Sequence, residues 1–267
     1  MLKYILKTAG IFCCTISICF AAPAFAAQPL VTDDTGTMGA MKFQLEAGAE
    51  FGWDREDNNG VATDAPYQLL SLTLTTGVLD SLDLVLALPF CWRQVEENGL
   101  KTYENGGLND ISLALKWSFL ELGPAGFALK PSMTIPSGDY NRGLGNARPA
   151  YGTTLISTVE FKPVTISANA GYTFQKYTDA DKSTCRENIW NLSMSGTTEI
   201  FKGLQMVAEV GSVSNVNSTN KSWQSFITGG LIYSVLDTLD IDVGLKYGLN
   251  NQAPDFALLA GFTVRTL

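Results

Sequence analysis

The stretch from residue 41 to residue 53 reads MKFQLEAGAEFGW, and apolar and polar side chains alternate along it. Phe43 and Leu45 belong to the apolar series, whereas Glu46 and Glu50 belong to the polar series. Period-two alternation is typical of a β-strand with one apolar and one polar face. The pattern by itself leaves open which of the two faces points inward.

The N-terminus carries the features of a secretory signal peptide. Two lysines precede an apolar run over residues 9–20, which is short for a membrane span, and Ala24-Phe25-Ala26 supplies a small-x-small site for a cut before Ala27. An uncleaved anchor is the alternative, and the cleavage site argues against it. We therefore expect an exported chain. Loss of the two lysines leaves 18 − 2 = 16 basic against 26 acidic residues, a balance that is not typical of a nucleic-acid-binding protein.

The alternation of the first stretch recurs along the mature chain and predicts twelve strands. Most of them run to about ten residues, the length that a tilted transmembrane strand requires. The sequence shows no amphipathic helical segment of useful length that could cover a sheet face. A soluble sandwich is the alternative, but sandwiches favour shorter strands. The predicted strands are residues 41–53, 67–77, 82–93, 110–119, 126–136, 151–161, 164–174, 189–199, 204–211, 225–235, 239–249 and 256–265.

Short and long connections alternate between these strands. Two of the short ones nearly repeat, VLDSLD (78–83) and VLDTLD (235–240), and an aspartate suits a tight turn because it can bond nearby backbone N–H groups. The long ones, such as residues 54–66 and 94–109, are polar and rich in glycine or asparagine. Short turns on one side and long loops on the other are typical of a bacterial outer-membrane barrel with the short side in the periplasm. An even number of strands then places both termini in the periplasm.

Aromatic residues test the membrane interpretation, because they are expected near the two interfaces. Aromatic residues gather toward both ends of the strands, whereas strand centres carry mainly Leu, Ala, Val and Ile. This pattern of two aromatic belts favours lipid on the apolar side. Pro89 and Pro131 fit less well, since each removes a ladder hydrogen bond unless a bulge accommodates it. The aromatic residues toward the long loops are Trp53, Phe90, Trp92, Tyr172, Phe174, Trp190, Tyr247 and Phe256, and those toward the short turns are Trp117, Phe119, Phe127, Phe161, Tyr233 and Phe262.

If the apolar face meets lipid, the other face lines a lumen that carries more acidic than basic side chains. These charges form either a pore that favours cations or neutral solutes, or ion pairs that hold the barrel together. The candidate lumen-lining residues by strand parity are Lys42, Glu46, Glu50, Asp83, Arg93, Lys116, Lys130, Glu199, Glu209, Asp240, Asp242 and Lys246, together with Asp110, Glu160 and Arg265.

Twelve strands enclose a lumen wider than the filled eight-stranded kind and narrower than that of the sixteen-stranded porins. Long side chains or an inward-folded loop could close it, and the segment Gln28–Gly39 could enter it from the periplasmic side. We divide the chain into a signal peptide (1–26), a periplasmic N-terminal segment (27–38) and a transmembrane barrel (39–267).

Cys91 and Cys185 remain in the mature chain. Cys91 has inward parity at the long-loop end of its strand, and Cys185 lies in a long loop on the same side. Oxidising conditions outside the cytoplasm permit a disulfide that would pin this loop over the mouth. Two unpaired thiols are the alternative, because cysteines on one side of a barrel can be out of reach of each other.

Other function classes find little support in the sequence. The chain contains no histidine, the side chain most often used for proton transfer near neutral pH, which argues against an outer-membrane enzyme. It also contains no zinc-ligand spacing and no phosphate-binding glycine loop, so we expect no metal and no cofactor. A closed structural or surface-recognition barrel is the alternative to a channel. Expected partners are outer-membrane lipid, the barrel-assembly machinery and a small-molecule solute, and not nucleic acid.

The sequence also resembles a bacterial family named for a putative meta-pathway of phenol degradation, whose members are labelled transporters. The resemblance implies an outer-membrane barrel that passes small molecules, with hydrophobic or aromatic solutes as candidates. The chain departs from such barrels by ending in VRTL rather than in an aromatic residue. The stretches that carry the resemblance are PLVTDDTGTMGAMKFQLEAGAE (29–50), NDISLALKWSFLE (109–121), LKPSMTIPSGD (129–139), RGLGNARPAYGTTLI (142–156), GLQMVAEVG (203–211) and LDIDVGLKYGLN (239–250).

The observations together predict a twelve-stranded antiparallel transmembrane β-barrel of the outer membrane. With no nucleotide site in the sequence, transport through it is expected to be passive.

Overall fold

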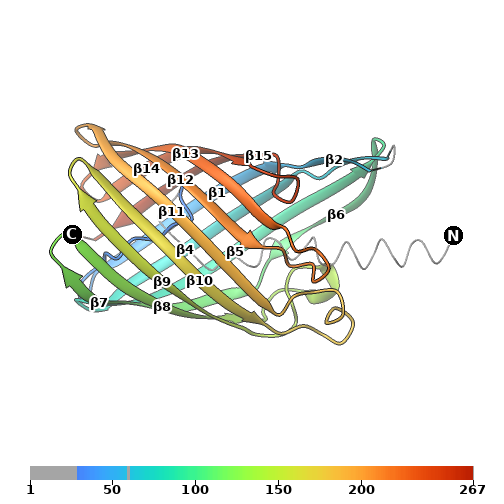
Figure 1. Cartoon of the computed structure of the whole chain (residues 1–267), viewed down its shortest axis with the longest axis horizontal. Helices are drawn as coiled ribbons and strands as arrows, with labels where there is room; N and C mark the ends of the chain where they lie inside the picture. The colour runs from blue at the N-terminus through green and yellow to red at the C-terminus, as the bar shows by residue number, and fades with distance from the viewer. Residues whose placement is uncertain (1–28, 59–60, 267) are drawn as a thin grey trace.

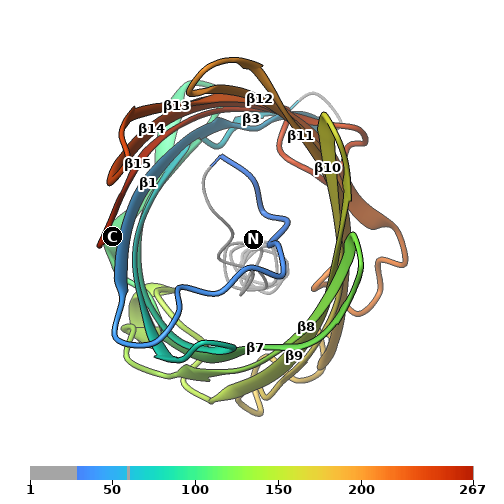
Figure 2. The same cartoon turned by 90° about the vertical axis from the view of Figure 1, so that its left-hand side faces the viewer.

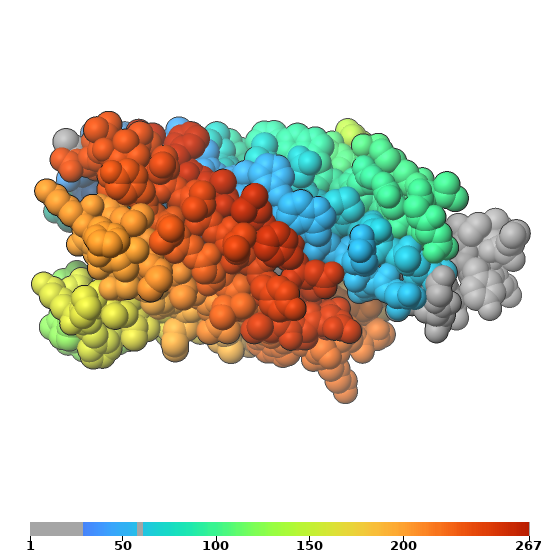
Figure 3. All heavy atoms as spheres, turned by 90° about the horizontal axis from the view of Figure 1, so that it is seen from above, coloured from blue at the N-terminus to red at the C-terminus, as the bar shows by residue number. Residues whose placement is uncertain are grey.

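The structure is a computed structural model, and it describes residues 29–58 and 61–266. Twelve antiparallel strands close into a barrel in which the last strand, β15, pairs with the first, β1 (Figures 1 and 3). This ring confirms the predicted fold. Its strands are β1 (Phe43–Trp53), β4 (Tyr67–Leu79), β5 (Leu82–Glu97), β7 (Ile111–Leu122), β8 (Ala125–Ile135), β9 (Ala150–Phe161), β10 (Val164–Gln175), β11 (Asn188–Phe201), β12 (Leu204–Ser214), β13 (Trp223–Leu236), β14 (Leu239–Gly248) and β15 (Phe256–Arg265).

Three further strands stand where the sequence predicted loops. These are β2 (Arg55–Asn58), β3 (Val61–Asp64) and β6 (Leu100–Leu108), and the expectation of irregular loops over 54–66 and 94–109 is therefore wrong for most of their length. The β5–β6 hairpin turns at Asn98 and Gly99, whose φ angles of 51° and 78° suit a tight hairpin turn. An Asn-Gly pair is a sequence signal for such a hairpin. The two polar strands that it joins extend the β-ladder beyond the membrane-spanning part of the barrel.

The two ends of the barrel differ as the loop lengths predict. Short turns and the C-terminus lie at one end in Figure 1, and β2, β6 and the long connections lie at the other. The long connection between β8 and β9 contains a single 3-10 turn, η2 (Tyr140–Arg142). Viewed along the barrel axis, the strands form a closed ring around a lumen, and the N-terminal segment of residues 29–42 runs inside it (Figure 2).

Large apolar side chains cover the outer face of the ring. Leu72, Val243 and Leu245 are between 37% and 55% exposed, although residues of this type are normally buried in a soluble protein. A continuous exposed apolar band indicates contact with lipid. Aromatic rings stack at the edge of this band nearest the long connections, where the ring centroids of Trp53 and Phe256 lie 5.7 Å apart. No helix among the described residues is long and apolar enough to cross a membrane.

The two prolines inside strands lie where a neighbouring ladder is interrupted. Pro89 lies where β5 changes partner from β7 to β6, so the N–H that it lacks would point toward the junction, and its carbonyl accepts from Asn109 N–H at 2.8 Å. Pro131 lies where the β7–β8 ladder skips two pairs between Ala114↔Ser132 and Trp117↔Leu129 without a change of register. Both prolines therefore occupy positions where the ladder is already interrupted.

Candidate functional site

The inner face of the ring is polar, and part of it is covered by the N-terminal segment, which we define as residues 29–42. Before β1 begins, this segment passes along the inner wall from β13 and β14 to β5 (Figure 2). A Cβ atom on Gly230 or Gly244 would lie 2.7–2.8 Å from the ring of Pro29, so the segment touches the wall there. The structure thus places the described residues 29–38 in the lumen.

Glu209 of β12 binds the beginning of the N-terminal segment. Its carboxylate accepts the backbone N–H of Val31 at 3.0–3.1 Å and that of Thr32 at 2.5 Å. The Thr32 hydroxyl donates to the same carboxylate at 2.5 Å and lies 2.8 Å from the Ser193 hydroxyl. A buried carboxylate normally requires such donors to replace its lost hydration. Glu209 therefore anchors a backbone and does not stand free in the lumen.

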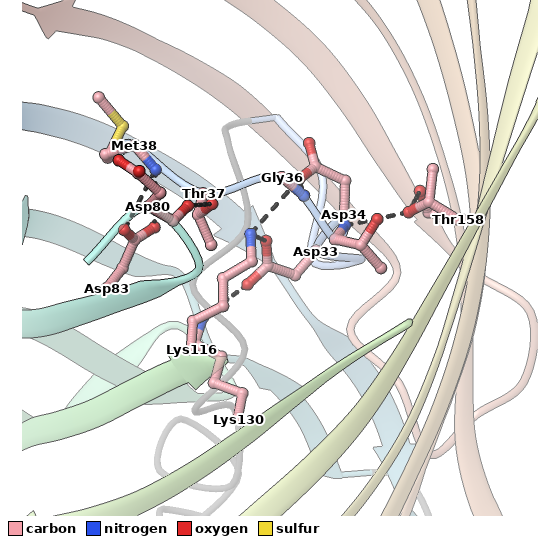
Figure 4. A network of polar contacts seen from close by, with 12 residues as sticks. Asp33, Asp34, Gly36, Thr37, Met38, Asp80, Asp83, Lys116, Lys130 and Thr158 are labelled. Carbon is pink, nitrogen blue, oxygen red and sulfur yellow. Dashed lines mark hydrogen bonds and ion pairs between the residues drawn. The ribbon is translucent and has the colours of Figure 1, made fainter. Parts of the chain in front are cut away.

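Asp33 is the centre of a buried ion-pair cluster. Its carboxylate oxygens lie 2.8 Å from Lys116 Nζ of β7 and 2.7 Å from Lys130 Nζ of β8, and all three side chains are less than 10% exposed (Figure 4). Lys116 also reaches the exposed carboxylate of Asp34 at 3.3 Å. The Asn169 amide, oriented to satisfy its neighbours, accepts from Asp33 N–H and donates to Asp33 C=O. The cluster neutralises two lysines that would otherwise be buried without a counter-charge.

The periplasmic end of the segment is held by β4, β5, β9 and the turn between β4 and β5. Thr35 N–H donates to the Thr158 hydroxyl at 3.1 Å, and Met38 N–H donates to the Asp83 carboxylate at 3.0–3.1 Å (Figure 4). Asp80 accepts the Thr37 hydroxyl through its carbonyl and the N–H of Ala40 through its carboxylate. Together with Glu209 of β12, these anchors on β5 and β9 tie distant parts of the wall together through the segment.

Four other predicted lumen charges form two ion pairs within the wall. Lys246 Nζ lies 3.1 Å from both oxygens of Glu50 and 5.1 Å from the centre of the Phe226 ring, and the Tyr67 hydroxyl donates to Glu50 at 2.6 Å. This cluster joins β1, β4, β13 and β14 near the end of the barrel that carries the long connections. Asp240 pairs with Arg265 in the same way near the periplasmic end.

The remaining predicted residues occupy different surroundings. Lys42 is exposed and precedes β1, so it lies at the periplasmic rim. Glu199 is exposed and accepts the N–H of Gly203, so its carboxylate serves the β11–β12 turn. Arg93 is half-buried on β5, opposite Tyr67. Glu46 and Asp242 are buried, and one oxygen of each has no hydrogen-bond partner among the described residues.

At the outer mouth, Asp110 shapes the connection between β8 and β9. Its carboxylate accepts the N–H of Gly138 at 3.0 Å and that of Asn146 at 2.9 Å. Leu144 of the same connection is buried, and a Cβ atom on Gly138 would lie 1.4 Å from its carbonyl oxygen. Burial raises the pKa of Asp110, although the backbone hydrogen bonds oppose the shift. Asp110 is thus a structural anchor of the mouth.

Cys91 and Cys185, the two cysteines of the possible bridge, are both buried, and they lie in different surroundings. Cys91 is buried on β5, whereas Cys185 is buried with Tyr177, Ile189 and Val216 beneath the connections that follow β10 and β12. β7, β8 and β9 stand between β5 and β10 in the ring, so the two cysteines belong to different parts of the wall, and the bridge between them stays a prediction.

Strand parity could not identify the residues that fill the lumen, because Thr32 and Asp33 lie outside every strand. One feature of the sequence could have indicated them: the pair Asp33-Asp34 precedes the first strand and offers counter-charges to inward-facing lysines. Within the described part of the chain, no group of three or more Cys, Asp or Glu side chains is placed to hold a metal ion. The lumen therefore presents hydrogen-bonding walls and ion pairs, arranged around the backbone of the N-terminal segment.

Several solved structures share this fold. The barrel is similar to the COG4313 outer membrane channel from Pseudomonas putida F1, with a TM-score of 0.68 and 12% identity over 87% of this chain and 98% of that chain. The NanC porin follows with a TM-score of 0.56 and 11% identity over 84% and 100%, and the KdgM porin with 0.52 and 9% over 84% and 99%. Identities at this level show a shared outer-membrane barrel fold.

A search of curated proteins gives no match. The model of one protein family, by contrast, matches residues 26–266, nearly the whole chain. This match confirms the resemblance that the sequence showed, and the chain belongs to the family described as "Putative MetA-pathway of phenol degradation".

Proposed function

We propose that the protein is a passive channel of the outer membrane for small molecules, and that its N-terminal segment sets the width of the path. The observation that carries the proposal is the way this segment is bound. Polar contacts to Glu209, Lys116, Lys130 and Asp83 hold it against a polar wall, whereas a permanent core would be packed with apolar side chains. Polar contacts can be exchanged for water when the segment shifts.

The solute class follows from the lumen and the family. Paired charges line the path, so small neutral solutes would meet no strong electrostatic barrier. The family description links related proteins to phenol degradation, which makes small aromatic molecules the first solutes to test. We assign the protein no enzymatic step, in keeping with a sequence that lacks histidine. Lipid and the barrel-assembly machinery are its proposed partners.

Planar-bilayer conductance of the purified protein tests the proposal. We expect small current steps for the natural protein. For a double variant, Asp33→Asn with Glu209→Gln, we expect larger steps from the barrels that still fold, as checked by heat-modifiable mobility on gels, since both anchors of the segment are then weakened although Asp33→Asn also costs stability. The control is Asp179→Asn, an exposed loop residue with the same change of charge as one of the two substitutions. Absence of conductance from all three, with no uptake of phenol by liposomes, would support the closed structural barrel instead.

A further inference from the structure

Phe226 places a large aromatic ring on the polar inner face of the barrel. It lies on β13 between Gln224 and Thr228, which share its face because side chains alternate along a strand. A Cβ atom on Gly211 of β12 would lie 2.3–3.0 Å from three atoms of the ring, so the ring is laid against the wall there. Lys246 Nζ of β14 lies 5.1 Å from the ring centre. Phe226 therefore forms a flat apolar platform among polar side chains.

Three polar groups around this ring have no hydrogen-bond partner in the described part of the chain. They are Gln224 Nε2, Thr228 Oγ1 and Asn191 Oδ1. Gln224 is 4% exposed and Thr228 is 1% exposed. Asn191 of β11 and Gln224 stand two strands apart, and each is opposite Val213 of β12. Proteins rarely leave buried polar groups unpaired, so such groups indicate a bound water or the polar groups of a ligand.

The three groups differ in the hydrogen bonds that they offer. The Gln224 amide nitrogen donates, the Asn191 amide oxygen accepts, and the Thr228 hydroxyl does both. Gln224 and Thr228 lie on either side of Phe226, and four residues of a strand separate their Cα atoms by about 13 Å. A ligand with one hydroxyl group cannot reach both sides of the ring. A ring that carries several hydroxyl groups on its rim can reach both, while its flat face packs on Phe226.

The charges nearest to these groups already have partners. Lys246, which is opposite Thr228, binds Glu50. Glu209, which is opposite Thr228 on the other side, binds the N–H groups of Val31 and Thr32. An anionic solute would lie near the Glu209 carboxylate and would compete with Glu50 for Lys246. The surroundings of Phe226 therefore favour a neutral solute.

We propose that Phe226, Gln224, Thr228 and Asn191 form a binding subsite for a small neutral ring with hydroxyl groups on its rim. The role of the ligand as a solute rests on the proposed channel function, whereas its binding is a separate property of the inner wall. Phe226 supplies the apolar contact. The three unpaired polar groups supply the specificity, because a ring without hydroxyl groups leaves them unpaired.

The position of the subsite gives it a place on the proposed path. Ser193, Gly211 and Phe226 are in register on three neighbouring strands, and Ser193 lies 2.8 Å from the Thr32 hydroxyl. The subsite therefore borders the N-terminal segment. Since β13 begins at the end with the long connections, Phe226 lies on the outer side of the point where Glu209 anchors Val31. A solute that enters from the outer mouth would be held there before it passes the segment.

Equilibrium dialysis of the folded barrel in detergent, against empty micelles, tests the subsite. The probes are resorcinol and glucose, which both carry several hydroxyl groups on a six-membered ring, one aromatic and one aliphatic. We expect saturable binding of at least one of them, and binding of toluene and benzoate that is at least about threefold weaker. Tighter binding of toluene or benzoate would overturn the proposal. Binding of neither probe would also overturn it and would leave water as the partner of the three groups.

The isosteric variant Thr228→Val separates a ligand-binding role from a structural one. It removes a buried hydroxyl that has no partner in the described free barrel, so the midpoint of thermal unfolding should stay unchanged or rise. Affinity for the bound probe should fall at least about threefold. Thr165→Val, on the inner face of β10 near the short turn, is the matched control and should leave the affinity unchanged. A lower midpoint with unchanged affinity would show a structural role and would overturn the proposal.

Phe226→Leu tests the apolar platform, because it keeps an apolar side chain and removes the flat ring. We expect weaker binding of the probe, and unchanged affinity in a barrel of unchanged heat-modifiable mobility would contradict the subsite. Conductance separates this proposal from the channel itself. A barrel that binds a probe but passes no ions and no solute would support the subsite and reject the channel. A barrel that conducts but binds no probe would retain the channel and overturn the subsite.

Discussion

Lys130 Nζ of β8 lies 2.7 Å from the carboxylate of Asp33, a residue that precedes it by 97 positions in the chain. This contact joins the barrel wall to a segment that belongs to no strand. The side chains of Lys130 and Asp33 are both less than 10% exposed, so solvent screens the attraction between their charges little. The contact explains why a lysine can be tolerated on the inner face of a narrow barrel, and it is the first target for mutation.

Replacing Asp33 by Asn should destabilise the barrel strongly. The substitution leaves Lys116 and Lys130 buried without a counter-charge, and breaking a buried pair typically costs about 3–5 kcal/mol. The thermal midpoint of the heat-modifiable gel band measures the loss. Asp34→Asn is the control, because the Asp34 side chain is 64% exposed and should matter little. Equal effects of the two substitutions would contradict the central role of Asp33.

An arginine on the outer face should be costly only at membrane depth. Val243 lies in the middle of β14 and is 55% exposed, so Val243→Arg should cost about 2–4 kcal/mol in lipid. Leu79 is equally exposed but ends β4 at the short turn, and Leu79→Arg should cost about 0–1 kcal/mol. Urea unfolding in lipid vesicles gives both values. Similar costs at both positions would argue against the assigned membrane depth.

Removing one member of the ion pair between Glu50 and Lys246 should change ion selectivity. Glu50→Gln leaves Lys246 as a net positive charge in the lumen, so the channel should shift toward anions. The reversal potential in a potassium chloride gradient measures the shift. Lys246→Met should move it in the opposite direction. Were neither variant to change the reversal potential, the conducting path would have to bypass this pair.

Asp54, between β1 and β2, should make the outer mouth sensitive to pH. Burial, and after it the charges of Glu56 and Asp255, raises its pKa to about 6 from an ordinary value of 3.8. Because the folded state binds the extra proton, stability should fall as pH rises from about 4 to about 6. Asp54→Asn should remove this dependence, whereas Asp179→Asn in another outer loop should retain it. Thermal unfolding midpoints between pH 4 and pH 7 provide the comparison.

Much of the fold could be predicted because strand periodicity is a local property. The opening stretch aligns with β1, and Leu45 faces out while Glu46 faces in, since neighbouring residues of a strand point to opposite faces. The polar hairpin of β5 and β6 was missed because its alternation is weak, although Asn98-Gly99 marks its turn.

The sequence by itself determined the twelve strands of the ring, their sidedness and the alternation of short turns with long connections. Only the tertiary structure decided how the lumen is filled and which charges meet. The reason is that closure of the ring brings strands together that are distant in sequence. The partner of an inward charge therefore depends on the position of its strand in the ring and on the route of the N-terminal segment, and neither is encoded in any local pattern.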